Sequence, residues 1–370
     1  MRVLFLDCSR RYGGASSRCL NLLSMAPRGT WALAGLKNSA VVKEAEKRGL
    51  EVHIIGRSKC DPAIFFRLKK LIREEKFQLI DVQNPQSKFW GVLAAPRTVP
   101  LISTLNSWYI NEHGGSLKGR CYQFLELKSA FRTAAFIAVS REIEGKLKTE
   151  GIAAEKIHYV HNGIGAEVAA VEADRQWLGR TFGIDVSGTV CCAVGRLVQA
   201  KGFEHLIRGL ARLKDRPVSC LIVGDGGERQ KLERMIAERK LGERIKITGM
   251  QAQDDVYRIV KSSDIYILSS VTEGMPMSVL EAAILEKPIL ATRVGQLPET
   301  FSDRKEALLI EKADDAKIAS GVIELIDDPE FARTMGECAG KRVRKAFSLD
   351  SQIRALEEIY KRHLEAGPQR

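Results

Sequence analysis

Short apolar runs alternate with longer amphipathic stretches along nearly the whole chain. The runs are continuous and lack the strict alternation of a half-exposed strand, as expected for strands that are covered on both faces. We predict strands at Val3–Cys8, Trp31–Leu36, Val52–Ile55, Leu79–Val82, Leu101–Leu105, Phe136–Val139, Ile157–Val160, Val190–Val194, Cys220–Val223, Ile245–Ile247, Ile265–Leu268, Ile289–Ala291 and Leu308–Ile310. Strands that alternate with helical segments are typical of parallel sheets with helices on both faces, so the sequence predicts an α/β protein.

These strands are too many for one twisted open sheet, which rarely exceeds about ten strands. The sequence therefore predicts two Rossmann-like, doubly wound domains that face a central cleft. Small residues around Asn162 and Gly163 suit a hinge, which divides the chain into domains of residues 1–164 and 165–348. A final helix is predicted within residues 349–370.

The positive charge of the chain is confined to its N-terminal half. The whole chain has a net charge of +12. Residues 1–164 hold 26 Lys and Arg against 14 Asp and Glu, whereas residues 165–370 hold 32 of each kind. This asymmetry indicates that the first domain meets an anionic partner, which is a nucleic acid, a phospholipid surface or a phosphate-bearing substrate.

The segment Asp61–Phe77 combines this charge with an apolar face at helical spacing. A basic amphipathic helix of this kind can lie on a membrane surface. It can also be a crossover helix that packs on a sheet and turns a solvated basic face outward. We favour the crossover helix, because most amphipathic helices in globular proteins are of that kind.

Composition argues against a membrane span or an export signal. The longest run without a charged residue is the 14 residues of Thr98–Asn111, whereas a membrane span needs about 20 apolar residues. Asp7 interrupts the apolar run at the N-terminus. The eight cysteines lack metal-type spacing, so we expect reduced thiols in a cytoplasmic protein.

We looked for candidate functional residues just after the strands, because ligands of doubly wound sheets bind beyond the carboxyl ends of the strands. Gly13 and Gly14 follow the first strand, where they either admit a phosphate or form a plain tight turn. Arg196 and Lys201 follow the strand that ends at Val194, and two permanent cations there can neutralise a diphosphate. The alternative for these two residues is a pair of solvated surface cations.

A second candidate is the segment Ser269–Glu281, which follows another strand. A proline is expected near the first turn of the next helix, which leaves the amides of Met277, Ser278 and Val279 free to bind an anion. Glu281 can accept hydrogen bonds from a ribose diol, or it can serve the helix dipole as an early acidic residue.

A resemblance to a known family rests on three motifs. They are Gly195-Arg196-Leu197 with Lys201-Gly202, Glu273-Gly274-Met275-Pro276 with Glu281-Ala282, and Lys287-Pro288-Ile289-Leu290-Ala291-Thr292. With them the chain resembles the nucleotide-sugar glycosyltransferases of the GT-B fold, and within these the large retaining group called glycosyltransferase family 4. Two glutamates with seven residues between them are the signature of that family.

The resemblance implies a role for each matching residue. The donor-binding residues are expected to be Gly14, Gly195, Met250, Gly274, Met275, Pro276, Met277, Ser278, Val279 and Glu281. Among them, Gly14 would approach the diphosphate from the other domain, Met250 would border the base, and Glu281 would bind the ribose hydroxyls. Arg196 and Lys201 are expected to hold the diphosphate and Glu273 to contact the donor sugar, and these three are the expected catalytic residues of the second domain.

The resemblance also implies that the first domain binds the acceptor and that the final helix crosses back to brace it. Where the family usually has a histidine near the reacting sugar, this chain has Asn106, which cannot act as a general acid or base. Asn106 or the nearby His113 is expected in that place, although His113 also fits an exposed loop histidine. No Asp-x-Asp motif is present, so no metal is expected, and the nucleotide sugar is a substrate and not a cofactor.

We therefore expect a hexosyltransferase that uses a UDP-sugar, with a GDP-sugar as the alternative donor, and retention follows from the family alone. The expected acceptor is a lipid-linked or glycan intermediate of cell-surface polysaccharide or lipopolysaccharide synthesis. The basic first domain would let a cytoplasmic enzyme sit peripherally on the inner face of the plasma membrane. A GT-B epimerase or phosphorylase is an alternative enzyme. A non-catalytic nucleic-acid binder is an alternative of another class, but no nucleic-acid motif supports it and no nucleic acid is expected.

Overall fold

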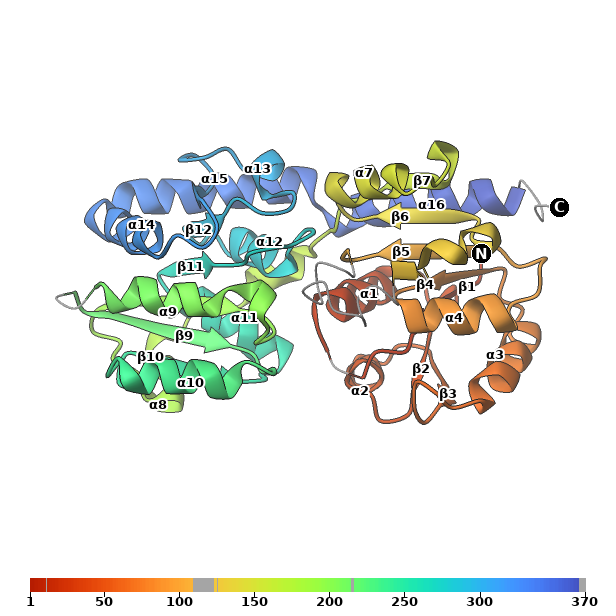
Figure 1. Ribbon diagram of the computed structural model, residues 1–370, viewed down its shortest axis with the longest axis horizontal. Helices are drawn as coiled ribbons and strands as arrows, with labels where there is room; N and C mark the ends of the chain where they lie inside the picture. The colour runs from red at the N-terminus through yellow and green to blue at the C-terminus, as the bar shows by residue number, and fades with distance from the viewer. Residues whose placement is uncertain (11, 109–122, 125, 214–215, 366–370) are drawn as a thin grey trace. The chain divides into compact units, whose positions relative to one another are not determined.

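The computed structural model (Figure 1) describes residues 1–10, 12–108, 123–124, 126–213 and 216–365. The chain divides into two compact units. Unit 1 comprises Met1–Gly163 together with Leu349–Arg370, and unit 2 comprises Ile164–Ser348. Each unit is built on its own parallel sheet.

Unit 1 contains a seven-stranded parallel sheet in the order β3-β2-β1-β4-β5-β6-β7. Its strands are β1 (Val3–Asp7), β2 (Trp31–Leu36), β3 (Val52–Gly56), β4 (Leu79–Val82), β5 (Leu101–Leu105), β6 (Ala135–Ala138) and β7 (Ile157–Tyr159). Each strand lies on one of the apolar runs, so the seven strands predicted in this half are confirmed. The chain order reverses between β1 and β4, which makes the sheet doubly wound.

Helices cover both faces of this sheet. They are α1 (Gly14–Met25), α2 (Ala40–Lys47), α3 (Ala63–Glu74), α4 (Pro85–Ala94), η1 (Ala130–Arg132), α7 (Arg141–Thr149), η2 (Ala154–Lys156) and α16 (Leu349–Glu365). Val3 and Phe5 of β1 belong to the apolar layer under α1, α2 and α16. Leu4 and Leu6 of the same strand belong to the layer under α3 and α4. This period of two explains why the strand sequence is apolar throughout.

The basic segment Asp61–Phe77 forms α3, which packs on the sheet as the favoured interpretation predicted. Ile64 and Leu68 are fully buried in the layer under this helix. On its other side the Phe66 side chain is 71% exposed among basic residues. Neither α3 nor any other helix in the described part of the chain is long and apolar enough to cross a membrane.

The C-terminal helix α16, predicted from its spacing, packs within unit 1. The Gln352 Oε1 atom accepts the N–H of Gly163 at 2.8 Å. The Tyr360 ring lies edge-on to Trp31, with 5.8 Å between the ring centroids. The Tyr360 hydroxyl donates to Asp81 Oδ2 at 2.5 Å. The last helix is therefore joined to the sheet by both apolar and polar contacts.

Unit 2 contains a six-stranded parallel sheet in the order β10-β9-β8-β11-β12-β13. Its strands are β8 (Thr189–Val194), β9 (Val218–Val223), β10 (Ile245–Gly249), β11 (Ile265–Leu268), β12 (Ile289–Thr292) and β13 (Leu308–Ile310), so the six predicted strands are confirmed. Its helices are η3 (Ala166–Ala170), α8 (Arg175–Phe182), η4 (Gln199–Lys201), α9 (Phe203–Ala211), α10 (Arg229–Glu238), α11 (Gln253–Ser262), α12 (Met277–Ile284), α13 (Leu297–Thr300), α14 (Asp315–Asp327) and α15 (Pro329–Ala346). The expected pair of doubly wound domains is thus present.

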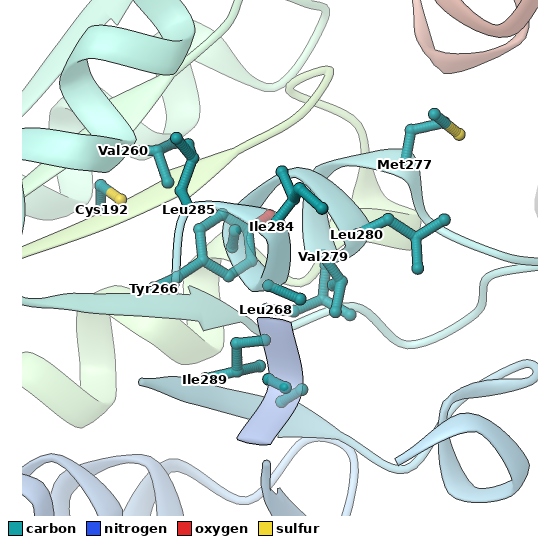
Figure 2. Close-up of a cluster of buried hydrophobic side chains, with 14 of the residues drawn as sticks. Cys192, Val260, Tyr266, Leu268, Met277, Val279, Leu280, Ile284, Leu285 and Ile289 are labelled. Atoms are coloured by element: carbon teal, nitrogen blue, oxygen red, sulfur yellow. The ribbon is translucent and has the colours of Figure 1, made fainter. Parts of the chain in front are cut away.

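One apolar layer of unit 2 fixes the position of α12 (Figure 2). Tyr266 and Leu268 of β11 and Val279 and Ile284 of α12 belong to the same buried cluster. Each of these side chains is at most 3% exposed. Because β11 leads into α12 through one loop, this packing holds the start of the helix at the carboxyl end of the strand.

Candidate active site

The candidate site lies at the carboxyl edge of the sheet of unit 2, where the chain order reverses between β8 and β11. The loops that follow these two strands carry the predicted cations and Glu273. The N–H of Val271 donates to the carbonyl of Ala200 at 2.8 Å. The Ser269 hydroxyl donates to the carbonyl of Lys201 at 3.0 Å. Two loops that lie far apart in the sequence are therefore hydrogen-bonded to each other.

Glycines allow the loops to approach this closely. Gly202 has a φ of 60°, and a Cβ atom there would lie 2.1 Å from the carbonyl oxygen of Ser269. Gly224 has a φ of 141°, and a Cβ atom there would lie 2.0 Å from the carbonyl oxygen of Gly195. A side chain at Gly202 would force apart the loops after β8 and β11, and a side chain at Gly224 would force the end of β9 away from Gly195, so both glycines serve the geometry of the site.

Lys201 and Glu273 form an ion pair across the two loops. The Ser270 hydroxyl also donates to Glu273 Oε1, at 2.7 Å. The Lys201 and Glu273 side chains are only 19% and 11% exposed, so solvent screens the pair weakly. Arg196 lies on the same loop as Lys201 and is exposed to solvent. Of the three catalytic residues expected in this domain, the structure therefore brings Lys201 and Glu273 into contact and places Arg196 on the loop that carries Lys201.

The start of α12 corrects one expectation. Pro276 is the N-cap residue and the helix begins at Met277. The N–H of Val279 donates to the carbonyl of Pro276 at 3.2 Å. The prediction of a free amide at Val279 is therefore wrong, because the first turn closes with a bond between residues three apart. The amides of Met277 and Ser278 keep their expected role as a prediction.

The loop before α12 is also held from the side of β12. The carbonyl of Gly274 accepts the N–H of Gln296 at 3.0 Å. Gly295 has a φ of 55°, and a Cβ atom there would lie 2.1 Å from the carbonyl oxygen of Gly274. Met275 is buried in the core of the unit. The segment predicted to contact the donor sugar is thus held in place by contacts within unit 2.

Glu281 is buried in the second turn of α12, where the residue is 5% exposed and its carboxyl group is close to α11. Gln253 Nε2 donates to Glu281 Oε1 at 3.4 Å. Burial raises the pKa of Glu281 to about 7, and a hydrogen bond with the Tyr257 side chain acts in the opposite direction. A residue that only served the helix dipole would lie exposed in the first turn. The burial of Glu281 therefore favours the hydrogen-bonding role.

The remaining predicted residues lie outside these two loops. Met250 follows β10 and is 55% exposed. In unit 1, Gly14 begins α1 and Asn106 follows β5, where its Nδ2 atom donates to the carbonyl of Gln83 at 3.4 Å. His113 lies outside the described residues.

Metal-ligating side chains do not cluster in the parts of the chain that the structure describes, since no group of three or more His, Cys, Asp or Glu residues there could hold a metal ion. His158 Nε2 lies 3.4 Å from His363 Nε2, whereas His161 Nδ1 lies 3.0 Å from the Asn162 carbonyl oxygen. These two histidines, at and just after β7, thus have separate partners.

The sequence did not point to a buried polar cluster at the carboxyl edge of the sheet of unit 1. Arg18 of α1 and Asp81 of β4 are 1% and 0% exposed, and Gln83 follows Asp81 at the end of β4. Arg18 lies four residues after Gly14, in the second turn of a helix that starts at a candidate phosphate loop. This position is the signal in the sequence that could indicate the buried cluster, but it suits an arginine on the surface equally well.

Two family models match this chain. The model described as "Glycosyl transferases group 1" matches residues 180–342, and the model described as "Glycosyltransferase Family 4" matches residues 39–168. This chain belongs to the group 1, or family 4, glycosyltransferases. The first match includes both loops of the candidate site, so the motifs of this glycosyltransferase lie where its sheet reverses.

Individual relatives agree with this assignment. The glycosyltransferase is 28% identical over 295 residues to MJ1178 of Methanocaldococcus jannaschii, an uncharacterised glycosyltransferase, which covers 79% of this chain and 77% of that protein. It is 27% identical over 173 residues to the lipopolysaccharide core biosynthesis glycosyltransferase LpsD of Rhizobium meliloti, which covers 47% of this chain and 49% of that protein.

The fold of the glycosyltransferase matches a solved structure over nearly its full length. The crystal structure of HepE from Anabaena in complex with UDP-glucose superposes with a TM-score of 0.86 at 20% identity, over 98% of this chain and 100% of that chain. At this identity the likeness concerns the fold. This glycosyltransferase therefore has the GT-B fold of two Rossmann-like domains.

Proposed function

We propose that this glycosyltransferase moves a hexosyl group from a UDP-sugar to a lipid-linked or glycan acceptor, with retention of the anomeric configuration and without a metal ion. The observation that carries the proposal is the ion pair of Lys201 with Glu273 at the point where the sheet reverses, beside Arg196 on the same loop. Fixed cations at this point suit a diphosphate, whose binding is expected at the carboxyl edge of such a sheet.

The reaction places negative charge on the departing diphosphate, and the cations of the site can stabilise that charge. The bond between the anomeric carbon and the diphosphate oxygen breaks, and its electron pair stays on the diphosphate. The oxygen of an acceptor hydroxyl bonds to the anomeric carbon, and its proton passes to the departing diphosphate. Lys201 and Arg196 would stabilise the negative charge that develops, and a donor of this kind is typically worth about 3 kcal/mol in the transition state.

Several of the remaining donor residues have a proposed contact. Glu281 would accept hydrogen bonds from the two ribose hydroxyls, and the amides of Met277 and Ser278 would meet the phosphates. Met250, which is exposed at the end of β10, would cover one face of the base.

The choice of donor and acceptor rests on the relatives. HepE was solved with UDP-glucose, which supports a UDP-sugar over the GDP-sugar alternative. LpsD acts in lipopolysaccharide core biosynthesis, which supports an acceptor from cell-surface glycan assembly. In unit 1, Asn106 is the described candidate for a residue near the reacting sugar, and His113 is the other candidate.

A lipid-linked acceptor would bring the enzyme to the inner face of the plasma membrane, and the surface of unit 1 supports this proposal. Seven of the eight large exposed hydrophobic side chains among the described residues lie in unit 1. Phe66 on α3 and Phe89 and Leu93 on α4 are three of them. Apolar side chains beside an excess of positive charge are the combination that binds anionic bilayers.

Calorimetric titration with UDP, GDP, ADP and their sugars tests the donor assignment. We expect UDP to bind the wild-type protein, and we expect Lys201→Ala to weaken that binding by about tenfold or more, which corresponds to one lost charge-assisted contact. Lys305→Ala is the matched control, because Lys305 is an exposed lysine of the same unit. If no nucleotide binds the wild-type protein, or if both variants bind UDP equally well, the donor site is assigned wrongly.

A further inference from the structure

Arg18 presents unused hydrogen-bond donors inside unit 1. Its side chain is 1% exposed. The Nη1 atom donates to Gln83 Oε1 at 3.5 Å, whereas Nε and Nη2 have no hydrogen-bond partner in the part of the chain that the structure describes. A buried guanidinium group with one long hydrogen bond is strongly unfavourable, because its other donors have lost their hydrogen bonds to water without gaining new ones.

The two unpartnered atoms lie on one edge of the guanidinium group. The N–H bonds of Nε and Nη2 point the same way, and this edge forms two parallel hydrogen bonds with a carboxylate or phosphate. Nη1, which contacts Gln83, belongs to the other side of the group. The edge of Arg18 that is suited to a two-oxygen anion is thus the buried edge that has no hydrogen-bond partner among the described residues.

Asp81, the described acidic residue whose charge acts on Arg18, does not fill this role. Asp81 Oδ1 accepts from Thr104 Oγ1 and from Gln83 Nε2, both at 2.8 Å, and Oδ2 accepts from the Tyr360 hydroxyl. Burial raises the pKa of Asp81 to about 6, although the charge of Arg18 is one of the influences that lower it. Asp81 and Arg18 therefore do not form a closed ion pair.

The position of Arg18 is the one expected for a ligand site. Gln83 directly follows β4, and Asn106 directly follows β5 and donates to the Gln83 carbonyl. Burial lowers the pKa of His161, just beyond β7, and the nearby charge of Arg18 adds to that effect. Arg18 thus lies among the carboxyl ends of the strands, where doubly wound sheets bind their ligands. Asn106 and His161 are half-buried, so solvent reaches residues at this end of the sheet, whereas Arg18 itself is buried.

We propose that the Nε and Nη2 edge of Arg18 binds a two-oxygen anionic group, a phosphate or a carboxylate, carried by the acceptor. The assignment of the anion to the acceptor rests on the proposed function, because it takes unit 1 as the acceptor domain. The anion site itself rests only on the geometry of Arg18, Gln83 and Asp81. Arg18 is then a residue that determines specificity, since it selects charged acceptors over neutral ones.

The test uses inorganic phosphate and acetate as probes of the two anion classes. Each is titrated into the wild-type protein, Arg18→Met and Arg28→Met, and binding is followed by calorimetry. Arg28 is an exposed arginine of unit 1, so its variant changes the net charge equally. We expect Arg18→Met to weaken the tighter probe by about tenfold or more and Arg28→Met to leave it unchanged. The tighter probe names the class, and equal binding by all three proteins would overturn the proposal.

Stability measurements separate a ligand site from a structural arginine. In buffer without phosphate or carboxylate, we expect Arg18→Met to melt at a higher temperature than the wild type, because the substitution removes an uncompensated buried charge. A large loss of stability in Arg18→Met would mean that Arg18 is satisfied within the fold and would overturn the proposal. Arg18→Lys keeps the charge but loses the planar fork, so it should fold and still bind the tighter probe about tenfold more weakly.

These results can be distinguished from a failure of the proposed function. Binding of phosphate at the donor site would contribute equally to the wild type and to Arg18→Met, so the difference between them reports Arg18 alone. If UDP does not bind but the Arg18-dependent anion binding remains, the donor assignment fails and the anion site stands. If UDP binds and the Arg18-dependent difference is absent, the anion site fails and the glycosyltransferase assignment stands.

Discussion

The Lys201 ammonium group and the Glu273 carboxylate, 72 residues apart in the chain, form an ion pair where the sheet of unit 2 reverses. In this arrangement the Glu273 carboxylate is paired with the Lys201 ammonium group, which the diphosphate of a donor would also attract. Ser270 holds the carboxylate from its own loop. Binding of the donor therefore requires the diphosphate to compete with Glu273 or to share Lys201 with it.

The first prediction concerns that competition. Glu273→Gln removes the negative charge but keeps the shape, so we expect UDP to bind about three- to tenfold more tightly, because the diphosphate no longer meets a nearby carboxylate. We expect turnover to fall at the same time, because the proposed contact with the donor sugar is altered. Calorimetry and steady-state kinetics measure the two effects, and Glu243→Gln, which changes an exposed glutamate, is the control. Weaker UDP binding by Glu273→Gln would show that Glu273 assists the diphosphate and does not compete with it.

The second prediction concerns the pH dependence of donor binding. Burial raises the pKa of Glu281 to about 7, so the carboxyl group is protonated below that pH and ionised above it. An ionised carboxylate accepts two ribose hydroxyls better than a carboxylic acid does. We therefore expect UDP-glucose affinity to rise between pH 6 and pH 8, by at most about tenfold per pH unit.

UDP-glucose is the suitable ligand for this measurement, because its diphosphate is esterified at both ends and does not titrate in this range. Glu281→Gln should bind the donor more weakly at pH 8 and should lose most of the pH dependence. A pH profile shared by the wild type and Glu281→Gln would mean that another group controls donor binding.

The third prediction concerns the buried pair of Asp81 and Tyr360. Burial raises the pKa of Asp81 from 3.8 to about 6, so the folded protein takes up a proton at a higher pH than the unfolded chain. The free energy of unfolding therefore rises as the pH falls from 7 through 6, and this gain is complete near pH 4. Relative to Asp81→Asn, the wild type should gain about 1.4 kcal/mol between pH 7 and pH 5.

Denaturant unfolding of both proteins at the two pH values checks this, because other titrating groups cancel in the difference. A constant difference between wild type and Asp81→Asn would contradict the raised pKa. Tyr360→Phe should lower the free energy of unfolding by about 1–3 kcal/mol at pH 7, since Asp81 then loses a buried hydrogen bond.

The fourth prediction separates the two sides of α3. Leu68 is fully buried, and Leu68→Ala should lower the free energy of unfolding by about 2–5 kcal/mol. Phe66 is 71% exposed, and Phe66→Ser should change that free energy by no more than about 0.5 kcal/mol. If unit 1 docks on membranes as proposed, Phe66→Ser should nevertheless bind anionic vesicles more weakly in a sedimentation assay. Equal binding of the wild type to neutral and anionic vesicles at low salt would remove the support for membrane docking.

The helices and strands and their order could be predicted from the amino-acid sequence. The continuous apolar runs predicted every strand of both sheets, because a strand covered on both faces needs apolar residues at successive positions. The motif loops could also be placed, since glycine and proline limit the backbone locally and the family pattern matches over residues 180–342. The basic α3 was assigned correctly to the sheet, because its spacing shows which of its sides is apolar.

Which groups meet, and which are removed from water, depends on how the elements pack. The ion pair of Lys201 with Glu273 and the contact of Tyr360 with Asp81 join residues 72 and 279 positions apart, and no local pattern specifies such pairs. The bond from the Val279 amide to Pro276 depends on how the first turn of α12 closes. The burial that raises the pKa of Glu281 and leaves two donors of Arg18 unpartnered arises when separate elements pack together. Whether a side chain is removed from water depends on how the whole molecule packs. The same residues are equally compatible with a solvated surface, so the sequence alone does not show which of them are buried.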